Sequence, residues 1–103
     1  MQASPAMPSP VGAGKLGCMP EISRFFGTVV GMFYNEHGSP HFHAVHGEHR
    51  ISVDVRSKTV RGDFPPRALR HLLEWAELHE DELLRNWERA REGKPLNPIP
   101  PLE

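Results

Sequence analysis

Cysteine and long apolar runs are the features that this 103-residue chain has least of. Cys18 is its only cysteine, which excludes an intramolecular disulfide and a cysteine-based zinc site. No apolar run is long enough to span a bilayer, and no signal-peptide core follows the N-terminus. These absences predict a protein of the reducing cytoplasm that does not enter a membrane.

A dominant charge of one sign is also missing. The chain carries 12 Lys and Arg residues against 13 Asp and Glu residues, for a formal net charge of -1. There is therefore no global basic field to hold nucleic acid, although a local basic face remains open. A hydrophobic content of 38% and a charged content of 24% are typical of one folded domain.

Complete catalytic signatures are absent as well. No Ser/His/Asp or Cys/His nucleophile pattern stands out, and no glycine-rich phosphate loop follows a predicted strand. The acidic run between Glu74 and Glu82 is interpreted as a solvated helix face.

The first 18 residues consist largely of Ala, Ser, Pro and Gly. This composition predicts a flexible N-terminal segment over residues 1–18, followed by a single domain over residues 19–103. Met19 stands at the change of composition and is a candidate for the native translation start.

Residues 40–55 predict the β-hairpin around which the rest of the chain is organised. Gly47-Glu48 suits a two-residue type II′ loop. Closing that loop pairs Ala44 with Ile51 and Phe42 with Val53 on an apolar face that ends at His46 and His49. The opposite face then carries three cross-strand pairs: His41 with Asp54, His43 with Ser52, and Val45 with Arg50.

Two further strands are expected around this hairpin. Residues 25–34, rich in aromatic and β-branched side chains, predict a first strand, and residues 59–61 predict a short last one. Together these segments give an antiparallel meander of three or four strands.

The C-terminal half predicts helices. Pro65-Pro66 suits a helix start, and Gly93 suits a helix end. Apolar residues recur at helical spacing in two sets, Leu69, Leu72, Leu73 and Ala76, then Leu83, Leu84, Trp87 and Ala90. The polar residues 79–82 between the sets predict a helical pair, or alternatively one kinked helix. The fold class is therefore α+β, with the helices packed on one face of the sheet.

Three blocks of sequence resemble one small bacterial family. They read PEISRFFG at residues 20–27, PHFHA at 40–44, and PPRAL with LEWAELH between residues 65 and 79. In this order and spacing they resemble the domain of unknown function 4160 family, with Ser39-Pro40 where that family often has Pro-Pro. The resemblance implies a component of a two-gene bacterial module of toxin–antitoxin or regulatory type.

His41, His43 and Asp54 are the candidate catalytic or metal-binding residues. Imidazoles two residues apart on a strand point the same way, and two His with one carboxylate can hold a divalent metal or act in acid/base chemistry. The alternative, which is the more common case, is a polar sheet face with a cross-strand His–Asp hydrogen bond.

Arg50, Arg56 and Trp75 are the candidate binding residues. If both arginines share the face of His41 and His43, that face could meet RNA or an acidic protein. Trp75 would mark a partner surface if it is exposed, although core packing is the commoner role for a tryptophan at helical spacing.

Two functions follow as hypotheses. The first is a binding or regulatory protein that acts through a protein partner, expected to be the product of the neighbouring gene. The second is a metal-dependent hydrolase of RNA or another phosphodiester that uses His41, His43 and Asp54. Nucleic-acid binding is the less favoured partner class, because the overall charge is close to neutral.

Overall fold

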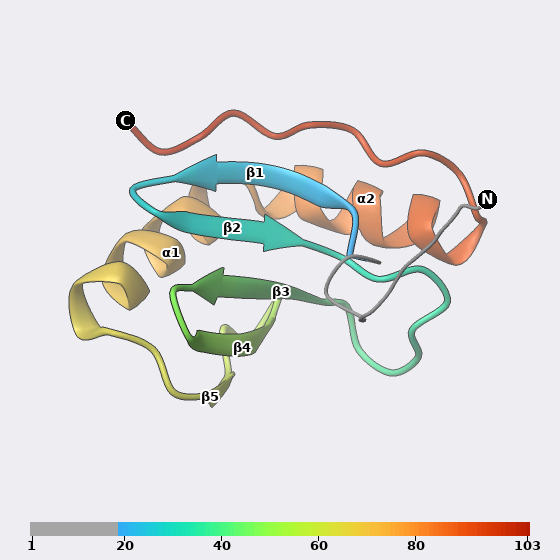
Figure 1. The fold of residues 1–103 in the computed structure, drawn as a ribbon. Helices are drawn as coiled ribbons and strands as arrows, with labels where there is room; N and C mark the ends of the chain where they lie inside the picture. The colour runs from blue at the N-terminus through green and yellow to red at the C-terminus, as the bar shows by residue number, and fades with distance from the viewer. Residues whose placement is uncertain (1–18) are drawn as a thin grey trace, which may run out of the picture.

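The computed structural model describes residues 19–103, so the segment 1–18 that was predicted to be flexible lies outside the described residues. The strands are β1 (Glu21–Phe25), β2 (Thr28–Gly31), β3 (His41–His46), β4 (His49–Asp54) and β5 (Val60–Gly62). They are followed by α1 (Pro66–Leu78) and α2 (Glu80–Arg91) (Figure 1). The five strands form one antiparallel sheet in the order β1-β2-β3-β4-β5. This arrangement confirms the α+β meander with a helical pair.

The central hairpin has the predicted register. His41 lies opposite Asp54, Phe42 opposite Val53, and the pairs continue to His46 opposite His49. Gly47 has a φ of 60°, as the first position of a type II′ loop requires. Because the side chains alternate along both strands, this register fixes which of them face the helices.

The number of strands differs from the prediction at the N-terminal side. The expected single strand over residues 25–34 is wrong at its start, because the chain reverses at Phe26-Gly27 and forms β1 and β2 as a hairpin. Phe26 has a φ of 50° and Gly27 a φ of 80°, the pair of positive angles that a type I′ loop needs. Phenylalanine is seldom found in that conformation, which hid the turn within an apparently continuous β sequence.

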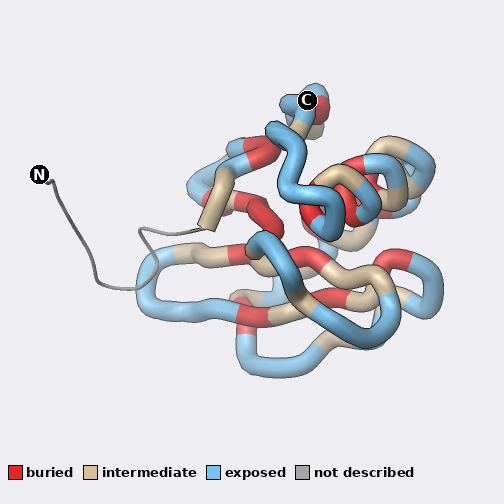
Figure 2. Tube along the Cα trace, turned by 90° about the vertical axis from the view of Figure 1, so that its right-hand side faces the viewer, coloured by how far each residue is buried: buried red, intermediate tan, exposed pale blue. Residues whose placement is uncertain are grey.

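The apolar core lies between the sheet and the two helices. Phe42, Ala44 and Val53 have no solvent exposure, and Trp75 of α1 is equally buried against them. The ring centroids of Phe42 and Trp75 are 5.9 Å apart in an edge-on arrangement. The buried segments of sheet and helices face one another along the chain trace (Figure 2).

The helical half contains two helices separated by a single residue, His79. Pro66 begins α1, and Gly93 follows the end of α2 with a φ of 72°. The buried side of α1 is rotated slightly from the predicted stripe, because Ala68, Leu72, Trp75 and Ala76 face the core. Leu69 and Leu73 are only partly buried at its margin.

The C-terminal tail runs beside β1 (Figure 1). The Ile99 amide donates a hydrogen bond to the Ile22 carbonyl at 2.8 Å, and the Trp75 indole N–H donates to the Pro100 carbonyl at 2.8 Å. The side chain of Asn86 bonds both the amide and the carbonyl of Asn97. The tail thereby covers part of the sheet edge, which would otherwise present unpaired backbone groups.

Candidate functional site

The sheet face opposite the core, here called the outer face, carries the candidate site. Alternation along β3 and β4 directs His41, His43 and Val45 to this face, with Arg50 and Ser52 across from them. Arg61 of β5 joins the outer face because it lies opposite Ser52. The predicted cross-strand pairs are confirmed by the register, and His41, at the first position of β3, also reaches Trp87 of α2, whose ring lies 4.9 Å from its own.

Three ligand-type side chains meet at one end of the outer face. The Oε1 atom of Glu36 lies 3.0 Å from the Nε2 atom of His41 and 2.9 Å from the Nε2 atom of His43. One potential ligand atom from each residue lies within 4.8 Å of the other two. The side chains are 20% to 28% exposed, so the group is sheltered but open to solvent.

Glu36 was not among the candidates drawn from the sequence. It lies in the loop between β2 and β3, where Asn35 has a φ of 63° and Gly38 a φ of 95°. These left-handed residues turn the loop back on itself and bring Glu36 to the histidines of β3. A glutamate inside an Asn/Gly turn just before a His-x-His strand is the signal that could have identified it.

The two imidazoles are held by their surroundings. The Nδ1 atom of His41 lies 2.9 Å from the Ser39 carbonyl oxygen, which can only accept, so this nitrogen carries the proton. The ring of Trp87 lies 4.9 Å from that of His41, and the ring of Phe33 lies 4.8 Å from that of His43. Hydrogen bonding and packing therefore both orient the Nε2 atoms.

Asp54 lies opposite His41, as predicted, but its carboxylate is engaged in the turn that follows β4. It accepts hydrogen bonds from the Ser39 hydroxyl at 2.7 Å and from the amides of Arg56 and Ser57 at 2.9 Å each. The Ser57 amide, followed by the Ser39 hydroxyl, lowers the pKa of Asp54 from 3.8 to about 2. The ligand atoms that converge belong to Glu36, His41 and His43 and do not include Asp54.

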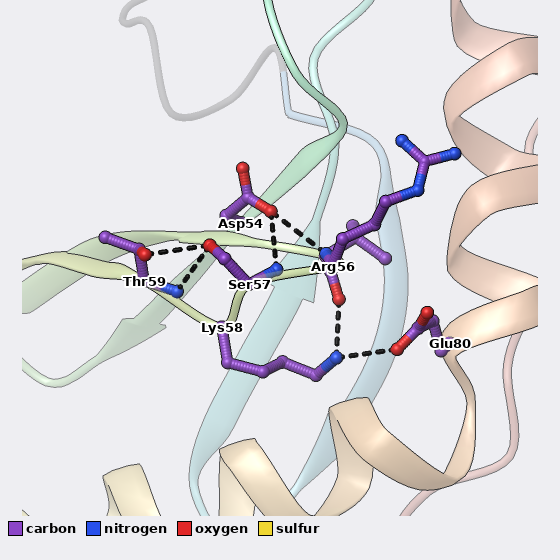
Figure 3. A network of polar contacts seen from close by, with 7 residues as sticks. Asp54, Arg56, Ser57, Lys58, Thr59 and Glu80 are labelled. Atoms are coloured by element: carbon purple, nitrogen blue, oxygen red, sulfur yellow. Dashed lines mark hydrogen bonds and ion pairs between the residues drawn. The ribbon is translucent and has the colours of Figure 1, made fainter.

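The turn held by Asp54 is anchored to the helices. Lys58, whose φ is 63°, donates hydrogen bonds from its ammonium group to the Val55 carbonyl and to Glu80 of α2 (Figure 3). Ser57 and Thr59 add a side-chain hydrogen bond at 2.7 Å. Asp54 thus links the β4–β5 turn to Ser39 in the loop that enters β3.

The predicted binding residues lie in two different environments. Arg50 is exposed on the outer face, and Arg56 is exposed in the turn after β4. Trp75 is fully buried and its indole N–H is satisfied by Pro100, so its ring offers no surface to a partner.

An open hollow of about 250 Å³ lies on the outer face. Met19, Phe33 and Val45 supply apolar lining, and Arg50 and Arg61 stand at its side. His43 lines both this hollow and the histidine cluster. The hollow and the cluster are therefore adjacent parts of one surface.

The remaining histidines of the hairpin lie away from this surface. His46 shares a 3.0 Å hydrogen bond with the hydroxyl of Thr28 and packs against Phe64. His49 is exposed at the turn. Neither belongs to the cluster, in agreement with the predicted faces.

Comparison with known proteins shows the family. The model of a domain of unknown function (DUF4160) matches residues 27–88, more than half of the chain, and the protein belongs to this family. The match includes the PHFHA block and leaves out β1 and the C-terminal tail. No curated protein and no solved structure was found to match. Within residues 19–103, neither helix is both long and apolar enough to cross a membrane.

The role of Asp54 in the turn predicts a pH-dependent stability. Because the folded-state pKa is lowered from 3.8 to about 2, the carboxylate stabilises the fold above pH 3.8 and loses this effect as the pH falls toward 2. Replacing Asp54 by Asn should cost about 1 kcal/mol of unfolding free energy at pH 7. Urea unfolding of both proteins should show the difference shrinking between pH 4 and pH 2. A difference that is constant over this interval would contradict the assignment.

Proposed function

We propose that this protein is a small bacterial cytoplasmic binding module that docks an acidic partner protein on its outer sheet face. The observation that carries the proposal is the apolar hollow flanked by Arg50 and Arg61. Neither arginine side chain makes an ion pair or hydrogen bond with another part of residues 19–103. Both charges are therefore available to a ligand.

The surroundings of the hollow favour an anionic partner. Arg56 is a third exposed cation, in the turn at the other end of β4 from Arg50, and its side chain likewise has no ion-pair partner among the described residues. Arg24, in contrast, is neutralised by Glu21 at 2.9 Å. Complementary charge at the rim of an apolar pocket speeds association and selects the partner, while burial in the pocket supplies affinity.

A protein fits this surface better than a nucleic acid. The net charge of the whole chain is -1, which provides little long-range attraction for a phosphate backbone. Met19, Phe33 and Val45 supply apolar lining in the hollow, and an apolar centre with a polar rim is the usual anatomy of a protein interface.

The family resemblance implies a two-gene bacterial module, which suggests the identity of the partner protein. Under the proposal, the partner is the product of the neighbouring gene, and the pair works as a regulatory or toxin–antitoxin-type unit. The two-gene module comes from the family resemblance alone, while the outer face supplies the proposed contact.

Charge reversal on the outer face tests partner binding. The double variant Arg50→Glu, Arg61→Glu should bind the co-expressed neighbouring gene product at least about 10-fold more weakly, since like charges replace complementary ones. Arg70→Glu, which changes an exposed arginine of α1, is the matched control and should bind normally. Affinity can be measured by calorimetry at low and moderate salt.

Equal affinity for the double variant and the Arg70→Glu control would place the contact elsewhere. A wild-type chain that stays monomeric and unbound beside the neighbouring gene product at micromolar concentration would refute the proposed function.

A second candidate function is metal-dependent hydrolysis of RNA or another phosphodiester. The convergence of Glu36, His41 and His43 favours it, because three protein ligands leave a metal position open for water. In this version Glu36 supplies the carboxylate that the sequence assigned to Asp54.

RNA cleavage with added Zn²⁺ or Mn²⁺ tests this candidate. If it holds, the wild-type chain cleaves RNA and the double variant His41→Ala, His43→Ala, purified identically, falls to the background rate. Equal cleavage by the two preparations would indicate a contaminating nuclease and would eliminate the hydrolase.

A further inference from the structure

We infer that Glu36, His41 and His43 form a binding site for one divalent transition-metal ion, with zinc as the representative. The site needs no ligand from a partner, since all three side chains come from this chain, and His43 also lines the adjacent hollow. It also differs from the arrangement expected from the sequence, because Glu36 takes the place assigned to Asp54.

The distances between the ligand atoms suit a small ion after a slight expansion. Zinc bonds of about 2.0–2.1 Å in a tetrahedron place neighbouring ligand atoms roughly 3.3 Å apart. The Oε1 atom of Glu36 lies 3.0 Å and 2.9 Å from the two Nε2 atoms. An outward movement of the Glu36 carboxylate by a few tenths of an ångström brings both distances to this value, and the two Nε2 atoms lie within 4.8 Å of each other.

The proton positions give an independent argument. His41 donates its Nδ1 proton to the Ser39 carbonyl, so in the neutral ring the lone pair of Nε2 points at the Glu36 oxygen. Two electron-rich atoms 3.0 Å apart repel each other unless an additional proton or a cation lies between them. A metal ion at this point accepts both lone pairs and removes the conflict.

The surroundings resemble those of metal-binding histidines in general. A ligating histidine usually donates its other N–H to a carbonyl or carboxylate, which fixes its tautomer, and Ser39 provides that acceptor here. Trp87 and Phe33 hold the two rings from the sides. Little conformational entropy remains to be lost when the ion binds.

The donor set selects the class of ion. Two imidazoles and one carboxylate suit Zn²⁺, Co²⁺, Ni²⁺ or Fe²⁺, whereas Mg²⁺ and Ca²⁺ prefer oxygen ligands throughout. The partial exposure of all three side chains leaves room for water at the remaining coordination positions.

Titration of the untagged, metal-free chain with Zn²⁺ tests the site, with the visible absorption of bound Co²⁺ as a second measurement. We expect one ion per chain and a higher melting temperature with Zn²⁺. Glu36→Gln and His43→Ala should each weaken binding at least about 10-fold, since even second-shell changes cost 10- to 100-fold. Circular dichroism should show that both variants are folded.

Two variants serve as controls. His49→Ala removes an exposed imidazole and Glu48→Gln removes an exposed carboxylate, both outside the cluster. Both should bind Zn²⁺ like the wild type. The inference is overturned if the wild type binds no ion at micromolar concentration or if Glu36→Gln leaves the affinity unchanged. It is equally overturned if either control loses as much affinity as Glu36→Gln.

Discussion

The register of the β3–β4 hairpin is the constraint on which the rest of the structure depends. With Phe42 opposite Val53 and Ala44 opposite Ile51, one face of the hairpin is buried against Trp75 and the helices. The same alternation sends His41 and His43 to the outer face. A slip of one residue would exchange the two sets and bury imidazoles in place of apolar side chains, which the core could not satisfy.

Two loops complete the candidate site that this register begins. The β2–β3 loop brings Glu36 to His41 and His43, and the β4–β5 turn is held by Asp54, which also accepts from Ser39. The Ser39 carbonyl in turn accepts a hydrogen bond from the Nδ1 atom of His41. Asp54, which lies opposite His41, therefore holds the residues that lead into β3. The carboxylate that lies beside the imidazoles belongs to Glu36.

Much of the fold could be predicted because local rules agree with tertiary packing. The hairpin register followed from alternation and the Gly47-Glu48 loop, and the helical pair followed from apolar spacing and its polar break. The reversal at Phe26-Gly27 escaped prediction because a phenylalanine with positive φ carries no propensity signal. Glu36 escaped prediction because its approach to β3 depends on the path of a loop. The position of Asp54 opposite His41 was predicted correctly from the register, but its hydrogen-bond partners in the turn were not predicted.

Cross-strand nuclear Overhauser effects in the labelled protein test the central claim most directly. We expect contacts between Phe42 and Val53 and between Ala44 and Ile51. A pattern displaced by one residue, with Phe42 opposite Ser52, would contradict the claim. In that case one of the two strands would present its polar side chains to the core, and the outer face as described would be lost.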